Sequence, residues 1–105
     1  MPTRRFNRER KADPDAMVLI DVRNSTPAEM ESMISGAIHI PQEELAGRLS
    51  EIPKDKTIIV YTWDDWCNLG ALSAIILLEN GYQAMELRGG IRAWETLGLE
   101  TVKLA

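Results

Sequence analysis

The ten residues YTWDDWCNLG, at positions 61–70, contain the only cysteine of the chain, Cys67. A cysteine thiolate is a strong nucleophile, and nearby cations or a helix N-terminus favour its formation. Cys67 follows Asp64 and Asp65 and precedes an apolar pattern of helical spacing. The start of that helix favours the thiolate, whereas two nearby carboxylates disfavour it. We therefore expect no strongly activated thiol, and Cys67 is either a structural residue or a nucleophile.

The neighbours of Cys67 suggest two roles for the same loop. Trp63 and Trp66 flank the two aspartates, and aromatic residues in loops usually pack against the rest of the fold. The alternative is an aromatic and acidic rim that binds a cationic or peptide partner. Asp64, Asp65 or Asn68 can each cap the helix that follows.

The loop lacks the cations that an anion-binding site needs. A site for a dianion presents Arg or Lys, and residues 61–70 contain neither. A phosphatase-type loop requires an arginine shortly after its cysteine, and residues 68–73 contain none. Phosphatase chemistry is therefore excluded as an interpretation.

The elements that position this loop alternate along the chain. Apolar runs predict strands over 17–21, 37–40, 57–61, 83–87 and 101–104. Helical spacing and stop signals predict helices over 27–34, 42–51, 69–79 and 91–97. Short connections between alternating elements predict an α/β fold with a central, mainly parallel sheet and helices on both faces. Ligands of such sheets bind beyond the carboxyl ends of the strands, where residues 62–68 lie.

Other polar residues stand at predicted element ends. Asp21 and Arg23 follow the first strand, where they either form a structural pair or support the loop at 62–68. Arg88 and Arg92 begin the segment after another strand and could converge on that loop. His39 has no second histidine to accompany it, so we expect a hydrogen-bonded core residue rather than a metal ligand. No metal site is predicted.

Composition limits the class of protein. A length of 105 residues fits one domain, and a net charge of −4 argues against a nucleic-acid partner. One cysteine cannot form an internal disulfide, and no apolar run has the length of a signal peptide or a membrane span. We therefore expect a cytoplasmic protein with no membrane partner.

Charge is unevenly distributed along the chain. Residues 1–16 carry five cations and three acids, a net charge of +2, which leaves −6 for the remainder. We expect a solvated basic segment over 1–16 before a domain over 17–105, with attraction of an acidic partner as the alternative.

Five short segments in the observed order resemble the rhodanese-like domain family. These are LIDVR at 19–23, SGAIHIP at 35–41, IIVY at 58–61, ENGY at 79–82 and LRGGIRAW at 87–94. The resemblance covers residues 17–103. It implies a small α/β domain and sulfurtransferase activity. In that chemistry a cysteine thiolate takes a sulfane sulfur from a donor such as thiosulfate and passes it on as a persulfide. The implied partners are a small sulfur donor or a protein thiol or persulfide, and no cofactor is implied.

The chain departs from the family pattern at the position of the nucleophile. The family cysteine directly follows the strand, and Thr62 occupies that position here. The loop also resembles a family variant, YCWGPGCN, whose second cysteine corresponds to Cys67. A smaller departure lies at 32–36, where SMISG replaces GHIPG.

Two hypotheses follow from the resemblance and the departure. In the first, the domain is a sulfurtransferase or persulfide carrier that uses Cys67. In the second, it is a catalytically inactive module that binds a protein partner through the Trp63–Trp66 loop.

Overall fold

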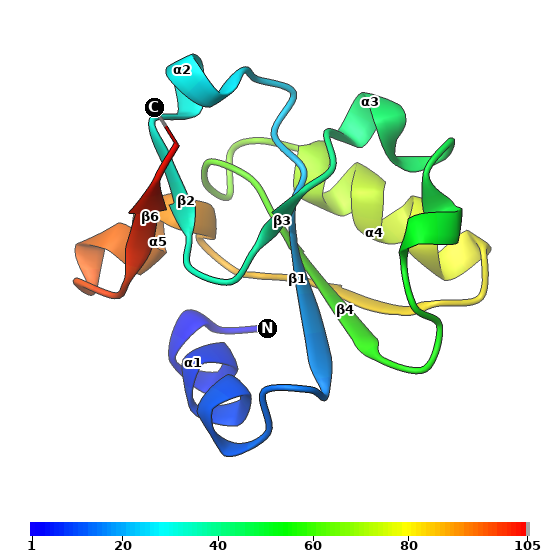
Figure 1. The fold of residues 1–105 in the computed structure, drawn as a ribbon, viewed down its shortest axis with the longest axis horizontal. Coiled ribbons are helices and arrows are strands. Elements are labelled where there is room, and N and C mark those ends of the chain that lie inside the picture. The colour runs from blue at the N-terminus through cyan, green and yellow to red at the C-terminus, as the bar shows by residue number, and fades with distance from the viewer. Residues whose placement is uncertain (105) are drawn as a thin grey trace.

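A parallel four-stranded sheet forms the centre of the protein (Figure 1). The computed structural model describes residues 1–104. Its strands are β1 (Met17–Asp21), β3 (Ile38–His39), β4 (Thr57–Tyr61) and β5 (Gln83–Glu86), in the spatial order β3-β1-β4-β5. Asp21 and Tyr61 are partners in the register of β1 and β4, so both strands end at the same edge of the sheet. The predicted α/β fold is confirmed.

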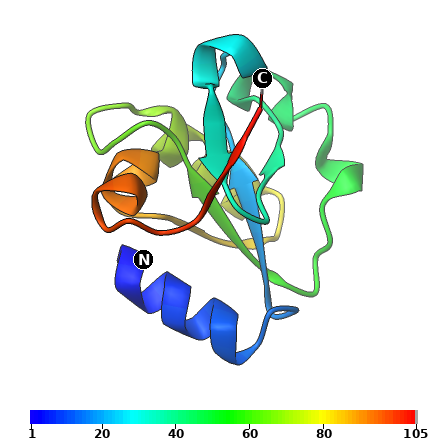
Figure 2. The same ribbon diagram turned by 60° about the vertical axis from the view of Figure 1, so that its left-hand side comes forward.

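Helices cover both faces of this sheet (Figures 1 and 2). The helices α1 (Thr3–Ala12) and α5 (Gly90–Thr96) pack on one face, and α3 (Gln42–Leu45) and α4 (Leu69–Glu79) pack on the other. Within residues 1–104 no helix combines the length and the apolar character that a membrane span requires.

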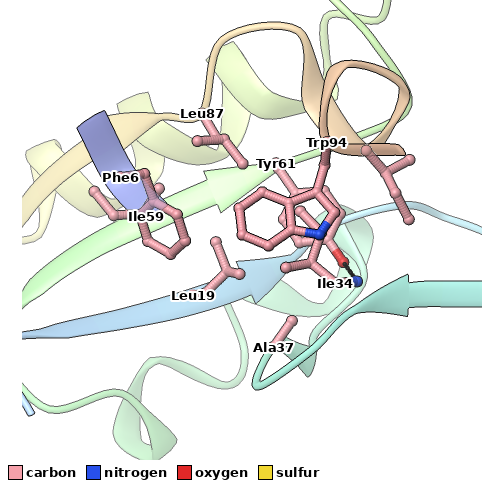
Figure 3. Packing of buried hydrophobic residues seen from close by; sticks show 9 residues of the cluster. Phe6, Leu19, Ile34, Ala37, Ile59, Tyr61, Leu87 and Trp94 are labelled. Atoms are coloured by element: carbon pink, nitrogen blue, oxygen red, sulfur yellow. Dashed lines mark hydrogen bonds between the residues drawn. The ribbon is translucent and has the colours of Figure 1, made fainter. Parts of the chain in front are cut away.

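Side chains that alternate along the strands build two cores. Leu19, Ile59 and Tyr61 point toward α1 and α5, where they pack with Phe6 and Trp94 (Figure 3). The neighbouring positions Ile20, Ile58 and Val60 point toward α3 and α4. Burial on both faces explains why the strands read as continuous apolar runs.

The basic segment at the start of the chain is mostly an amphipathic helix. Phe6 is fully buried and meets Trp94 edge to face, with ring centroids 6.0 Å apart. Arg4, Arg5 and Arg8 are exposed on the same helix. These three arginines are solvated as expected, whereas Arg10 is half-buried against the Phe6 and Trp94 rings. Phe6 joins the helix to the core.

Some elements differ from the predictions. The helix expected over 42–51 is divided into α3 and a 3-10 helix, Leu49–Glu51. The helix at Pro27 ends at Met30 as α2, and residues 32–34 form β2 (Ser32–Ile34) instead of continuing the helix. This strand pairs antiparallel with β6 (Thr101–Lys103) in a separate two-stranded ribbon.

Two predicted helix boundaries agree with the structure. Thr26 and Glu29 form a reciprocal capping box at the start of α2, as the hydroxyl residues before Pro27 indicated. The second boundary is the end of α4, which the pair Asn80–Gly81 predicted. The helix ends at Glu79, and Gly81 adopts a positive φ of 85°. Glycine accepts that backbone conformation without the cost of a Cβ.

Candidate functional site

The loop of residues 62–68 lies at the carboxyl edge of the sheet, beside the residues that follow β1. The Val22 N–H donates a hydrogen bond to the Tyr61 carbonyl at 3.0 Å, which continues the pairing of β1 and β4 to their ends. The loop then leads into α4. The structure thus places Asp21, Arg23 and the loop at one edge of the sheet.

The side chains of Thr62 and Cys67 meet inside the loop. The Thr62 hydroxyl donates a hydrogen bond to the Cys67 sulfur, with Oγ1 and Sγ 3.1 Å apart. Thr62 is 1% exposed, whereas Cys67 is partly exposed. The Cys67 N–H donates to the Asp64 carbonyl at 3.3 Å, which folds the loop back on itself. The Thr62 side chain is therefore buried against the one thiol of the chain.

The first residues of α5 hold the loop through backbone hydrogen bonds. The Ile91 N–H donates to the Thr62 carbonyl at 3.0 Å, and the Arg92 N–H donates to the Trp63 carbonyl at 3.1 Å. A Cβ on Gly90 would lie 2.4 Å from the Thr62 oxygen, a contact that real Cβ atoms do not make. The close approach of two backbone segments thus explains Gly90, the first residue of α5.

The two aspartates stabilise the loop and do not cap α4. Asp65 Oδ1 accepts a hydrogen bond from the Gly89 N–H at 2.7 Å, across to the start of α5. Asp64 Oδ1 accepts from the Trp66 N–H at 3.0 Å, and its Oδ2 lies 3.5 Å from Arg92 Nε. Asn68 occupies the N-cap position of α4 without a side-chain capping hydrogen bond. The acidic residues therefore fix the shape of the loop.

The two tryptophans lie in different environments. The Trp63 ring stacks on the Arg23 guanidinium, whose Cζ is 4.3 Å from the ring centroid. Trp66 is 94% exposed. Trp63 is thus packed onto the fold, and Trp66 projects from the loop into solvent.

Asp21 and Arg23 form a buried ion pair beneath Trp63. Both side chains are 0% exposed, and Arg23 Nη2 lies 2.6 Å from Asp21 Oδ2. Arg23 also donates to the Ser32 carbonyl at 2.7 Å, and its own carbonyl lies 2.8 Å from His39 Nε2. Arg23 Nη1 is buried and has no hydrogen-bond partner within residues 1–104. The contact of His39 agrees with the expected hydrogen-bonded core residue.

Two of the three arginines that could converge on the loop are already paired with a carboxylate. Arg23 is paired with Asp21, and Arg92 lies against Asp64. Arg88 is exposed and contributes its backbone to the pairing with Met1. Residues 57–87 contain no Lys or Arg, so the cations at this end of the loop come from the segment before and within α5, where Arg92 pairs with Asp64 and Arg88 lines a surface hollow with Asp65 and Glu86.

A further carboxylate, Glu86, lies beside the first turn of α4. A Cβ on Gly70 would lie 2.0 Å from Glu86 Oε2, so glycine makes room for this carboxylate. Burial raises the pKa of Glu86, and the nearby Asp65 raises it further. Glu86 was not predicted to belong to the site. The one signal in the sequence was the lack of Lys and Arg from 57 to 87.

Replacing Glu86 by glutamine is expected to stabilise the protein near neutral pH. Because its pKa is raised, the folded state holds the Glu86 proton to a higher pH than the unfolded chain does. The carboxylate therefore destabilises the fold above the folded pKa, and the penalty disappears below the unfolded value of about 4.3. Since Glu86 is partly exposed, we expect a gain below about 1 kcal/mol near pH 7 and none near pH 4.

Urea unfolding of the wild type and Glu86→Gln at both pH values measures this difference. Glu79→Gln is the matched control, because it removes one exposed carboxylate from the end of α4. An equal loss of stability at both pH values would contradict the prediction.

The described part of the chain, residues 1–104, contains no cluster of three His, Cys, Asp or Glu side chains arranged to hold a metal. The site is instead built from one thiol, one hydroxyl and the backbone of a loop.

Comparison with known proteins identifies the family to which this fold belongs. Residues 6–97 match the model of the rhodanese-like domain. A sulfurtransferase of Allochromatium vinosum is 39% identical over 99 residues, which cover 90% of this chain and 86% of the relative.

Solved structures give the same result. A full-length protein from Lactobacillus plantarum has a TM-score of 0.94 and 30% identity, and the match covers 99% of this chain and 87% of that one. A rhodanese-related protein from Thermoplasma volcanium has a TM-score of 0.75 and 26% identity, covering 90% and 92% of the two chains. The chain belongs to the rhodanese-like domain family.

Proposed function

We propose that this domain is a persulfide carrier in which Cys67 holds the transferred sulfur. The observation that carries the proposal is the hydrogen bond from the Thr62 hydroxyl to Cys67 Sγ, at 3.1 Å. A hydroxyl donor stabilises a sulfur anion more than it stabilises a neutral thiol. Cys67 also lies directly before the N-cap of an eleven-residue helix, whose dipole favours negative charge.

The proposed transfer needs no group beyond the donor and the acceptor. The Cys67 thiolate attacks the outer sulfur of a persulfide, R–S–SH, and the R–S⁻ thiolate leaves. Cys67 then carries –S–SH, and an acceptor thiolate removes the outer sulfur by the same substitution, which regenerates the Cys67 thiolate. Each step forms one S–S bond and breaks one S–S bond, so electrons balance.

The charge around the loop favours a thiol persulfide over thiosulfate as donor. Three carboxylates, Asp64, Asp65 and Glu86, lie near the start of α4, where Arg92 pairs with Asp64 and Arg88 lines one hollow with the other two. A dianion such as thiosulfate is repelled by these carboxylates more strongly than a singly charged persulfide, and a neutral persulfide is not repelled. The sulfurtransferase name of the Allochromatium vinosum relative supports sulfur transfer in general.

Thr62 supports the carrier role for a second reason. A hydroxyl beside the sulfur can donate a hydrogen bond, but it cannot displace sulfur from a persulfide. A thiol in the same place can do so. A neighbour without a thiol therefore favours a persulfide that survives until an acceptor arrives.

The second candidate is a catalytically inactive module that binds a protein partner. The observation in its favour is Trp66, which is 94% exposed within an acidic loop. Trp63 contributes less to such a surface, because its ring stacks on Arg23. This candidate predicts a folded protein whose Cys67 takes up no sulfur.

Intact mass spectrometry tests the proposal directly. The wild type, treated with inorganic polysulfide and desalted, is expected to gain one sulfur atom, because the chain has one thiol. Cyanide should remove that sulfur as thiocyanate. Cys67→Ser should gain nothing, and Trp66→Ala, which changes the exposed tryptophan and keeps the thiol, should behave as the wild type does.

Treatment with thiosulfate separates the donor classes. We expect a much lower yield of the same adduct at equal concentration, because residues 61–70 contain no Arg or Lys to neutralise the sulfite dianion that must leave. A folded wild-type protein that gains no sulfur from polysulfide would overturn the carrier function and favour the inactive module.

A further inference from the structure

A groove lies between α1, the first half of β1 and the turn after β2. Its volume is about 700 Å³, within the range of about 300–1,000 Å³ that small-molecule sites occupy. In Figure 2, α1 runs below the turn between β2 and β3, on the side of the molecule where the groove lies. No residue of the loop 62–68 lines it. The groove is therefore a second feature, independent of Cys67.

The floor of this groove is apolar. It is formed by side chains of α1, β1 and the segment after α5, namely Phe6, Met17, Val18, Leu19 and Leu99. Phe6 and Leu19 belong to the buried core, and Met17 and Leu99 pack against it while staying partly exposed. An apolar floor of this kind favours the hydrocarbon part of a ligand.

One wall of the groove carries a fixed cation, Arg10. Its guanidinium Cζ lies 5.0 Å from the Phe6 ring centroid and 5.3 Å from the Trp94 ring centroid. Nη1 donates a hydrogen bond to the Ser35 carbonyl at 2.6 Å. The side chain is thus held in one place by stacking on two aromatic rings and by one hydrogen bond.

Arg10 lacks the carboxylate that a half-buried arginine usually has. Among residues 1–104 no acidic group lies within ion-pair distance of it, and the Ser35 contact is its one hydrogen bond. Glu100 also lines the groove and interacts with Arg10 only at longer range. A guanidinium has five N–H donors and only one bond is made here to the described residues, so donors remain for an anion.

Further positive charge surrounds the same place. Lys11 lines this groove and an adjoining one of about 490 Å³, which is also lined by Arg4 and Arg8. Glu100 is the acidic residue among those that line the two grooves. The charge of this surface is therefore complementary to an anion, although the whole chain is acidic.

We propose that this groove binds a small amphipathic carboxylate, with its head at Arg10 and Lys11 and its hydrocarbon part on the apolar floor. The planar guanidinium matches a carboxylate in shape and supplies paired N–H donors. The apolar floor contacts the hydrocarbon part of the ligand, and the volume of the groove suits a small molecule.

Sodium octanoate, well below its micelle concentration, is the probe. Titration into ¹⁵N-labelled protein should shift the amide signals of residues 6–11, 17–19, 35–36 and 99–100 in a saturable manner, with a dissociation constant on the order of 1 mM. Octylammonium has the same chain and the opposite charge, and it should not shift these signals. Loading of Cys67 with sulfur should be unaffected, so the outcome is separate from that of the proposed function.

Variants of α1 identify the head-group contacts. Arg10→Gln is expected to weaken octanoate binding about tenfold, the effect of losing a hydrogen bond to a charged group. Lys11→Gln, at an exposed position that folding does not require, should weaken it a few-fold. Arg5→Gln is the matched control: it removes the same charge from the same helix, and Arg5 lines neither groove.

Three results would overturn the proposal. They are saturation by octylammonium at the same signals, equal weakening by Arg5→Gln and Lys11→Gln, and no saturable shift at these residues in the folded wild type.

Discussion

Asp21→Ala is expected to lower the free energy of unfolding by about 3–5 kcal/mol, a large part of the about 5–15 kcal/mol that a domain possesses. The reason is the burial of both partners, which are 0% exposed in the wild type. Removal of the carboxylate leaves the Arg23 charge in the interior, where Nη1 already has no partner. A buried cation without its counterion is far more costly than the loss of a surface pair.

Urea unfolding measures this effect, and Glu9→Ala is its control. Glu9 pairs with Arg5 at 2.9 Å on the exposed surface of α1, so its loss should cost less than about 1 kcal/mol. The double variant Asp21→Leu/Arg23→Leu removes both charges and should recover part of the loss, because an apolar pair carries no burial penalty for charge. If Asp21→Ala cost no more than Glu9→Ala, the buried pair would have no such role.

The same substitution connects stability to the candidate site. The Arg23 guanidinium stacks on the Trp63 ring at 4.3 Å, and Trp63 directly follows Thr62. Movement of an unpaired Arg23 therefore disturbs the first residues of the loop. We expect the ion pair to act on Cys67 through the position of Trp63, and not as a source of charge for a substrate.

The order of elements was predictable from the sequence because it depends on local patterns. The run at 57–61 consists of apolar or β-branched residues throughout, and the signal at Asn80–Gly81 ends α4 at the expected place. Parallel strands that are buried on both faces leave this pattern wherever they occur. The position of the loop then followed from the general rule for ligand sites in parallel sheets.

Features that depend on distant residues were not predictable. The strands β2 and β6 are three residues each and pair across most of the chain, from Ser32 to Lys103. The strand β6 was predicted over 101–104 without its partner, whereas residues 32–34 were predicted to be helical, because three residues are too few to show a period. The role of Phe6 was likewise hidden, because one aromatic residue in a basic run shows no helical pattern of burial.

The candidate site was likewise predictable only in part. That Thr62 and Cys67 belong to one loop was clear from the sequence, whereas their 3.1 Å contact was not. The loop owes its shape to α5, through the bonds of Ile91 to Thr62 and of Gly89 to Asp65. Side-chain directions in an irregular loop are set by such distant contacts, which spacing along the chain does not encode.

In the variant Thr62→Cys, Cys67 is expected to lose the transferred sulfur as hydrosulfide instead of keeping it as a persulfide. The new thiol would stand where the Thr62 hydroxyl now lies, 3.1 Å from Cys67 Sγ. Once Cys67 carries a persulfide, the neighbouring thiolate attacks the inner sulfur, forms a disulfide between positions 62 and 67, and expels hydrosulfide. The variant treated with polysulfide should therefore lose two hydrogens in mass instead of gaining a sulfur, and it should release sulfide.

Thr62→Ser provides the matched control for this last prediction. It keeps the hydroxyl donor to Cys67 and supplies no thiol, so its sulfur adduct should persist as in the wild type. The size of the expected difference is large, about tenfold or more in retained adduct, because an adjacent thiol acts at a high effective concentration. If Thr62→Cys retained as much sulfur on Cys67 as Thr62→Ser, the absence of a second thiol would not explain a lasting persulfide. The presence of threonine at position 62 would then be explained by the packing of a buried side chain alone.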